Sequence, residues 1–232
     1  KGAHYTGGFP DHPHRGFESV TYMPAGRMRH GDNQGNVGLL RPGSVQWMTA
    51  GRGIIHSEMP EQEEGLMQGF QLWVNLPAKD KMTKPRYQDI DPENVPVVER
   101  PDGTKVKVLV GSFDGISGPV TNVATDPLYL DITLPAGVSA RVPVEAEHNA
   151  FAYVFEGTAK IGAEAQLVEH GQLAVLSLGD GVTVEGGLQG GRLILVAGRP
   201  LREPVAKYGP FVMNTPDEIR QAIADYQAGR FV

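Results

Sequence analysis

The chain has 232 residues with a net charge of −6, and about a fifth of them are glycine (30) or proline (18). Glycine and proline at this density exclude a mainly helical protein, and the negative charge excludes an overall basic field for nucleic acids or anionic membranes. The absence of cysteine excludes disulfides, thiolate metal sites and cysteine nucleophiles, and no apolar run is long enough to span a bilayer.

Short strands separated by turns are predicted along the first third of the chain. Phe17–Met23 is rich in β-forming residues and is followed by a Pro-Ala-Gly turn. Phe70–Leu76 alternates apolar and polar residues, as a half-buried strand does. The other strands predicted in this part are Met28–His30, Val37–Leu40, Val45–Thr49 and Ile54–Met59.

The segment Pro77–Asp102 is rich in proline and in mixed charges, and we interpret it as a linker between two halves. The two halves look like diverged copies of one unit, which indicates a duplicated antiparallel barrel. We therefore expect two domains, residues 1–100 and 101–232. The strands predicted in the second half are Lys105–Val110, Leu128–Leu134, Ala150–Phe155, Gln172–Leu178, Gly181–Glu185 and Arg192–Ala197.

One helix is predicted near the C-terminal end. Thr215 is a good N-cap, Pro216 suits the first helical position, and Glu218 completes a capping box. Gly229 can terminate the helix. We expect a packing or lid helix, whose apolar stripe is formed by Ile219, Ala222, Ile223 and Tyr226.

Two short groups carry the residues most typical of a metal site: His12-Pro13-His14 and His56-Ser57-Glu58. Each group has two residues that can bind a metal at positions i and i+2, and side chains with this spacing point to the same face of a strand. Together they could supply three imidazoles and one carboxylate, a set that suits Fe, Ni, Cu, Mn or Zn. Either group alone is weak evidence, because a surface His-Pro-His costs nothing and a His beside a Glu is often a satisfied polar pair. The histidines predicted in loops or at the surface are His4, His30, His148 and His170.

Glu18 is a second candidate for the carboxylate. His12, His14 and Glu18, followed by Gly26, resemble the first metal motif of the cupin superfamily, in which a Glu at this place often binds metal. From the residues alone, Glu18 and Glu58 both fit the fourth position.

Longer runs of the chain resemble the pirin family, and the resemblance extends from the first residues to the last. It implies an all-β bicupin of two antiparallel β-barrels with a C-terminal helix. It also implies a metal in the N-terminal barrel, bound by His12, His14, His56 and Glu58, with Glu18 behind these ligands. The second barrel, which has Val184 and Gly186 at the matching positions, is expected to be metal-free. The runs that carry the resemblance are Gly8–Tyr22, Pro42–Pro60, Leu72–Pro77 and Leu201–Thr215.

The resemblance implies an oxidoreductase, a dioxygenase that cleaves a flavonol such as quercetin with O₂ (quercetin 2,3-dioxygenase activity). Fe(II) is the expected metal, with Ni, Cu, Mn and Zn as alternatives. Glu58 would be both a ligand and the base that deprotonates the flavonol 3-hydroxyl, and the ring would open with loss of CO. Because some pirins are regulatory, including nuclear transcription cofactors, the alternative is an iron-dependent redox sensor that binds a protein partner without turnover. Another cupin activity, such as an isomerase, is a third hypothesis.

The expected partners are a flavonoid-like molecule and O₂, or a protein under the regulatory alternative, with no direct nucleic-acid or membrane binding. We expect a cytoplasmic protein, or also a nuclear one in a eukaryote. Arg15 and Arg52 are candidates for steering an anionic substrate, although salt bridges are the commoner role. An apolar wall for a flat ligand, or ordinary core, is predicted at Phe17, Trp47, Met48, Phe70 and Trp73.

Overall fold

The structure is a computed structural model that describes residues 7–61 and 64–231. The chain divides into two compact units. Unit 1 comprises Lys1–Glu93 and Leu201–Val232, and unit 2 comprises Asn94–Pro200. Residues 201–232, which were grouped with the second domain on sequence, therefore cluster with the first part of the chain.

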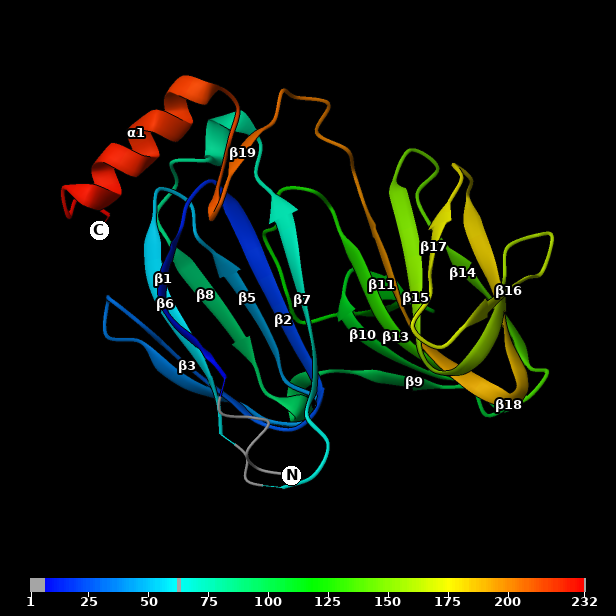
Figure 1. Ribbon diagram of the computed structural model, residues 1–232. Coiled ribbons are helices and arrows are strands. Elements are labelled where there is room, and N and C mark those ends of the chain that lie inside the picture. Colours follow the sequence, from blue (N-terminus) through cyan, green and yellow to red (C-terminus); the bar gives the residue numbers. More distant parts are fainter. Residues whose placement is uncertain (1–6, 62–63, 232) are drawn as a thin grey trace. The chain divides into compact units, whose positions relative to one another are not determined.

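Unit 1 is built on two four-stranded antiparallel sheets (Figure 1). The first sheet has the order β1 (Phe9–His14), β6 (Ile54–Pro60), β3 (Met28–Asp32) and β4 (Val37–Leu40). The second has the order β7 (Gln68–Asn75), β2 (Phe17–Ala25), β5 (Val45–Thr49) and β8 (Arg86–Ile90).

Unit 2 is one eight-stranded antiparallel sheet around a core of valine, leucine, isoleucine and alanine. Its β18 (Gly181–Gly198) is a single long strand, although two strands were predicted there. Its main path runs β16 (Gln166–Glu169), β15 (Asn149–Ile161), β18, β13 (Leu128–Leu134), β10 (Lys105–Val110) and β9 (Val97–Glu99). Off this path, β14 (Ser139–Pro143) pairs with β18 and β17 (Leu173–Leu176) with β15, and a separate hairpin is formed by β11 (Ser112–Phe113) and β12 (Ile116–Ser117).

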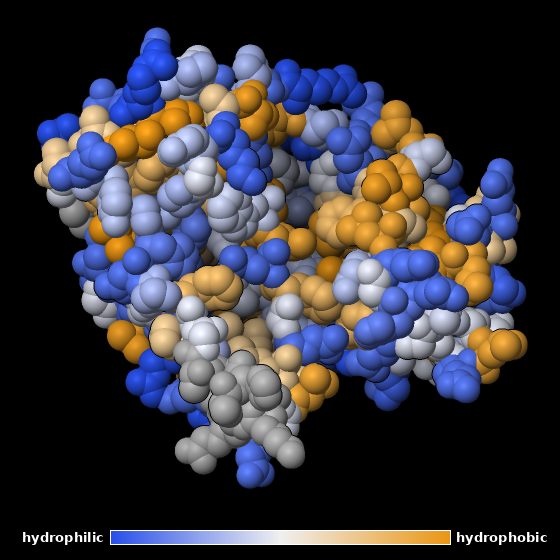
Figure 2. All heavy atoms as spheres, viewed as in Figure 1, coloured by the Kyte–Doolittle hydropathy of each residue, from blue (hydrophilic) through white to orange (hydrophobic). Residues whose placement is uncertain are grey.

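Strand β17 is apolar on both faces. Ala174 and Leu176 pack against the core of unit 2. Leu173 and Val175, which alternate with them, are 52% and 81% exposed. Figure 2 shows hydrophobic residues gathered on the surface over this strand.

The segment interpreted as a linker contains regular structure. Besides the short 3₁₀ helices Ala78–Asp80 and Pro92–Asn94, it contributes β8 to unit 1 and β9 to unit 2. These strands were not predicted, because prolines and charges surround them in the sequence. Each is stabilised by pairing with another strand: β8 pairs with β5, and β9 pairs with β10.

The C-terminal segment contains β19 (Ala206–Tyr208), β20 (Phe211–Met213) and α1 (Pro216–Gln227). The predicted capping box is confirmed: the Thr215 side chain accepts from the Glu218 amide, and the Glu218 carboxylate accepts from the Thr215 amide. The all-β prediction with one C-terminal helix is likewise confirmed. Within residues 7–61 and 64–231, no helix has the length and apolarity needed to cross a membrane.

Two buried cations connect this segment to the rest of unit 1. Lys81, 1% exposed, donates to the carbonyls of Gly16 and Val212, both at 2.8 Å, and its burial lowers the pKa of its ammonium to about 8. Arg15 pairs with Asp225 of α1 at 2.8 Å. Both contacts reach the turn that follows β1, which explains why residues 201–232 belong to unit 1.

We predict that Lys81→Met lowers the free energy of unfolding in urea by about 2–3 kcal/mol, because it leaves buried carbonyl groups of Gly16 and Val212 without their donor. Lys79→Met, at an exposed position of the 3₁₀ helix that precedes Lys81, is the matched control and should change stability by less than about 0.5 kcal/mol. Equal stability of the two variants would contradict this role of Lys81.

Candidate metal centre

The centre is built where β1 and β6 pair in antiparallel fashion. His12 lies directly opposite His56, and His14 lies opposite Ile54. Alternate residues of β6 are buried, so that Ile54, His56 and Glu58 share one face of the strand. The i, i+2 spacing seen in the sequence therefore aims both histidine groups at one region.

The three histidines come together as the sequence predicted. Their ring centroids are separated by 4.7 Å (His12–His14), 4.4 Å (His12–His56) and 4.9 Å (His14–His56). One ligand nitrogen from each ring lies within 4.8 Å of the other two. His14 and His56 are 3% and 1% exposed, and His12 is partly buried. This triad could hold a metal ion.

The nitrogens of the triad fit a metal better than they fit the surrounding protein. Neither ring nitrogen of His56 has a hydrogen-bond partner, although both are buried. Buried polar atoms are nearly always paired, so an unpaired imidazole needs an explanation. His12 Nδ1 lies 2.8 Å from the Pro10 carbonyl oxygen. If Nδ1 carries the proton and donates to this carbonyl, the lone pair of Nε2 is free to bind a metal. Two to three ring nitrogens with unused lone pairs therefore surround one point, which is the arrangement of ligand atoms that a metal ion needs.

Burial keeps the inner imidazoles neutral. Desolvation, with a further contribution from His12, lowers the pKa of His14 to about 4, although the Pro210 carbonyl opposes the shift. Desolvation and the neighbouring histidines lower the pKa of His56 to about 3. Because metals bind the neutral imidazole, these two ligands need no deprotonation near neutral pH.

Glu58 lies beside the triad and is held by neutral side chains. It is 2% exposed, and both of its carboxylate oxygens accept from Gln71 Nε2, at 2.9 and 2.8 Å. Thr21 Oγ1 donates to Oε1 at 3.2 Å. The carboxylate is not among the atoms within 4.8 Å of one another in the triad. Its assignment as the fourth ligand stays a prediction.

Gln71 was missed in the sequence. The alternation along β7 places Gln71 on the same face as Trp73. Which face meets Glu58 follows only from the pairing of β7 with β2, in which Gln71 lies opposite Thr21. No local signal identifies that register.

Glu18 is separated from the triad by strand alternation. Thr21 of β2 faces Glu58, so Glu18, an odd number of residues away, points to the opposite face. Its carboxylate accepts from Thr49 Oγ1 at 2.6 Å. Burial raises the pKa of Glu18, and the hydrogen bond from Thr49 acts against that rise. Of the two carboxylates proposed for the fourth position, Glu58 is therefore the one beside the triad.

An aromatic pair adjoins the triad. The Phe17 ring lies 5.0 Å from the His14 ring, and the Trp73 ring lies 5.4 Å from His14 and 4.3 Å from Phe17. Phe17 is buried, whereas Trp73 is 41% exposed. The pair thus connects the metal centre to solvent through an apolar surface.

Trp47 and Phe70 lie on the face of the second sheet that points away from the triad, whereas Met48 lies on the same face as Thr21. Trp47 is buried and lies opposite Val20, on the same face of β2 as Glu18. Phe70 stacks on Tyr22, and Met48 is buried in a cluster with Ala50 and Ile54.

The two candidate arginines differ in exposure: Arg15 is buried and Arg52 is exposed. Arg15 is 4% exposed, pairs with Asp225 and lies 4.3 Å from the Phe231 ring, so it has the structural role that was the commoner expectation.

Two of the remaining histidines are buried, against expectation. His30 of β3 is 2% exposed, with Nε2 3.5 Å from Asp89, and His148 is 9% exposed. The short strand around His30 has too few residues for its buried face to be recognised from sequence. His170 is exposed in a turn, as predicted, and His4 lies outside the described residues.

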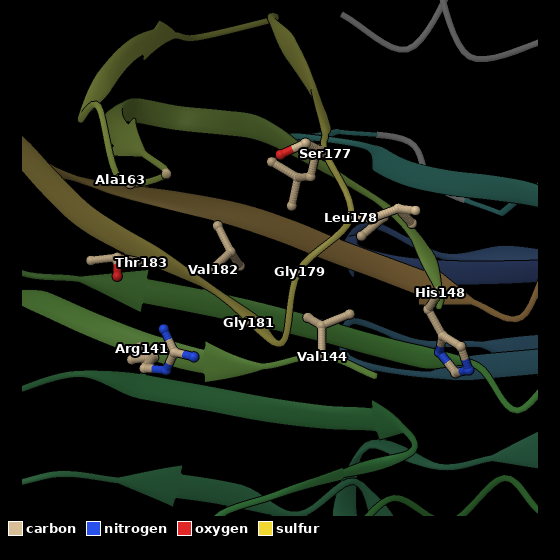
Figure 3. Close-up of a pocket in the computed structure, with 13 residues that line it drawn as sticks. Arg141, Val144, His148, Ala163, Ser177, Leu178, Gly179, Gly181, Val182 and Thr183 are labelled. Carbon is tan, nitrogen blue, oxygen red and sulfur yellow. The ribbon is translucent and has the colours of Figure 1, made fainter. Parts of the chain in front are cut away.

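At the positions of unit 2 that match His56 and Glu58, the chain has Val184 and Gly186. Val184 is fully buried in the core. A pocket of about 200 Å³ is lined mostly by apolar side chains and glycines, with Arg141 and His148 as its titratable groups (Figure 3). That the second barrel binds no metal stays a prediction.

Comparison with known proteins gives matches along most of the chain. The family model described as Pirin matches residues 2–74, and the Pirin C-terminal cupin domain matches residues 129–232. A pirin-like protein from Caulobacter vibrioides is 50% identical over 228 residues, which cover 98% of this chain and 82% of that protein. Pirin from Homo sapiens is 46% identical over 225 residues, covering 95% and 77%.

A solved structure agrees in fold over nearly the whole chain. The crystal structure of quercetin 2,3-dioxygenase from Acinetobacter baumannii has a TM-score of 0.91 at 35% identity, covering 97% of this chain and 79% of that one. Together with the cupin family model, this match confirms the predicted bicupin fold class.

The low pKa values of His14 and His56 predict that the metal-free protein loses stability in mild acid. Between pH 6.5 and about 4, the unfolded chain binds protons on both residues and the folded chain does not, so the free energy of unfolding falls as the pH falls. Each such proton contributes a slope of about 1.4 kcal/mol per pH unit.

Urea unfolding of chelator-treated protein between pH 7 and 4.5 measures this slope. His56→Leu should reduce it by about one proton, whereas His170→Leu, at an exposed turn position, should not change it. A slope that is the same in both variants would show that His56 titrates normally.

Proposed function

Because this chain belongs to the pirin family, we propose that it is a metal-dependent dioxygenase that cleaves a flavonol such as quercetin with O₂ and releases CO. The observation that carries the proposal is a triad of imidazoles with unpaired nitrogens beside a solvent-exposed aromatic side chain. The similarity in fold to a quercetin 2,3-dioxygenase at 35% identity adds support.

His12, His14 and His56 would hold the ion, and Glu58 is the proposed fourth ligand. Fe(II) is the proposed metal, and Ni, Cu, Mn and Zn suit the same donor set. When bound, the ion supplies a Lewis-acid and redox centre with positions open to other ligands. Four protein ligands would leave up to two positions of a six-coordinate ion to other ligands.

Glu58 is proposed as the general base that takes the proton of the flavonol 3-hydroxyl. A base must lie within hydrogen-bond reach of that proton, and Glu58 is the buried carboxylate next to the triad. Gln71 fixes its orientation by donating to both carboxylate oxygens. Gln71 is itself exposed, and its amide lies between the buried carboxylate and solvent.

The aromatic pair is proposed to hold the flat substrate. Phe17 is immobilised by burial, and it supports the Trp73 ring at 4.3 Å. An aromatic ligand packed against this pair would displace water from the apolar surface next to His14. The substrate would then be oriented before its hydroxyl reaches Glu58.

The metal assignment predicts that His56→Ala removes at least half of the bound iron, because two imidazoles remain where three were present. Elemental analysis of the iron-loaded protein after gel filtration measures the stoichiometry. His170→Ala is the matched control, since it removes an exposed imidazole of unit 2, and it should keep one ion per chain. Full iron content in His56→Ala would contradict the assignment.

The catalytic assignment predicts that iron-loaded protein consumes quercetin in air, with loss of flavonol absorbance and release of CO. Glu58→Gln should lower kcat by about 10²–10⁴-fold through loss of the base. Gln71→Leu should lower kcat less, by about tenfold, because the base remains but its orientation is lost. Rates are expressed per bound metal ion, so that a loss of metal is not counted as a loss of base.

Absence of turnover with each first-row metal would overturn the dioxygenase proposal. Retained metal binding in such a protein would favour the regulatory hypothesis for the same centre. Unchanged kcat in Glu58→Gln, in an otherwise active protein, would remove Glu58 from the mechanism and keep the rest.

A further inference from the structure

Lys207 places a positive charge next to the metal centre. Its Nζ lies 5.0 Å from the centroid of the Trp73 ring, on a strand (β19) that comes from the other end of the chain. A cation over an indole face is attracted by the electron density of the ring. Trp73 therefore holds the Lys207 ammonium at a defined place beside the aromatic pair.

This charge is available to a ligand. Lys207 is exposed, and no carboxylate of the described residues lies within 4.0 Å of its ammonium. Arg15 and Lys81, by contrast, are buried and use their donors within the protein. Arg15 had been a candidate for steering an anionic substrate, and the structure places Lys207 where such a residue would act.

The distances limit where a bound anion would lie. The Trp73 ring is 5.4 Å from the His14 ring and 5.0 Å from the Lys207 ammonium. The ammonium is therefore no farther from the His14 ring than the sum of these distances, about 10 Å. One planar molecule of several fused or linked rings can span the metal centre and the ammonium at the same time.

We propose that Lys207 binds an anionic group at the end of the substrate that is remote from the metal, and that Trp73 positions the ammonium for this contact. The inference rests on the proposed function and restricts the range of its substrates. The preferred substrates are planar phenols that carry a second negative charge, such as a carboxylate, a sulfonate or an ionised phenol. Lys207 is a specificity-determining residue that does not touch the reacting atoms.

The test compares two flavonols on the iron-loaded full chain without O₂. One is 3-hydroxyflavone, which has a single hydroxyl, and the other is a sulfonated quercetin, which carries an anionic group away from the 3-hydroxyl. Dissociation constants are measured by quenching of tryptophan emission. Wild-type protein should prefer the sulfonated ligand, and Lys207→Gln should reduce the ratio of the two dissociation constants by about tenfold. Lys207→Glu should reduce it further, and added salt should reduce it in wild-type protein.

Lys84→Gln is the matched control, because it removes another exposed positive charge of unit 1. It should leave the ratio unchanged. Equal ratios in wild-type, Lys207→Gln and Lys207→Glu would overturn the inference, as would an equal reduction in Lys84→Gln.

The binding measurement is independent of turnover. A protein that shows the Lys207-dependent preference but consumes no flavonol in air would contradict the dioxygenase proposal and support the anion site. A protein that consumes both flavonols with no Lys207-dependent preference would do the reverse.

Discussion

The register in which His12–His14 of β1 pairs with Ile54–His56 of β6 is the constraint on which the candidate centre depends. It sets His12 opposite His56 and brings His14 onto the same face. A shift of one residue would turn every second side chain to the other face of the sheet, and the imidazoles would no longer meet. Side chains of the second sheet, including Phe17 and Trp73, pack against His14. The burial of His14 and His56 keeps both imidazoles neutral.

The C-terminal segment completes the surroundings of this centre. Arg15, the residue after His14, is joined to Asp225 of α1, and Lys81 joins the next residue, Gly16, to β20. Both cations are buried, and each would be costly to leave unpaired. Strand β19 of the same segment brings Lys207 to Trp73. The N-terminal segment of unit 1 thus provides the proposed ligands of the metal, and its C-terminal segment provides the positive charge proposed to face the substrate.

What the sequence predicts correctly is local. The i, i+2 histidine groups and the capping box of α1 depend on residues within a few positions of one another, and both are found. Elements held by distant pairing were missed, such as β8 and β9. Gln71 and Lys207 were missed for the same reason, since each meets its partner only through the register of strands far apart in the chain. His30 was placed at the surface, but its ring is buried and stacks on Tyr87 of β8, a strand distant in sequence.

One metal ion is proposed to lie among the three imidazoles of unit 1. Crystals of the iron-loaded protein, with diffraction data collected at the iron absorption edge, test it most directly through the anomalous difference map. We expect a single peak per chain, about 2.1 Å from a nitrogen of each of His12, His14 and His56. A peak at any other place, or a distance to one of these rings too long for coordination, would contradict it.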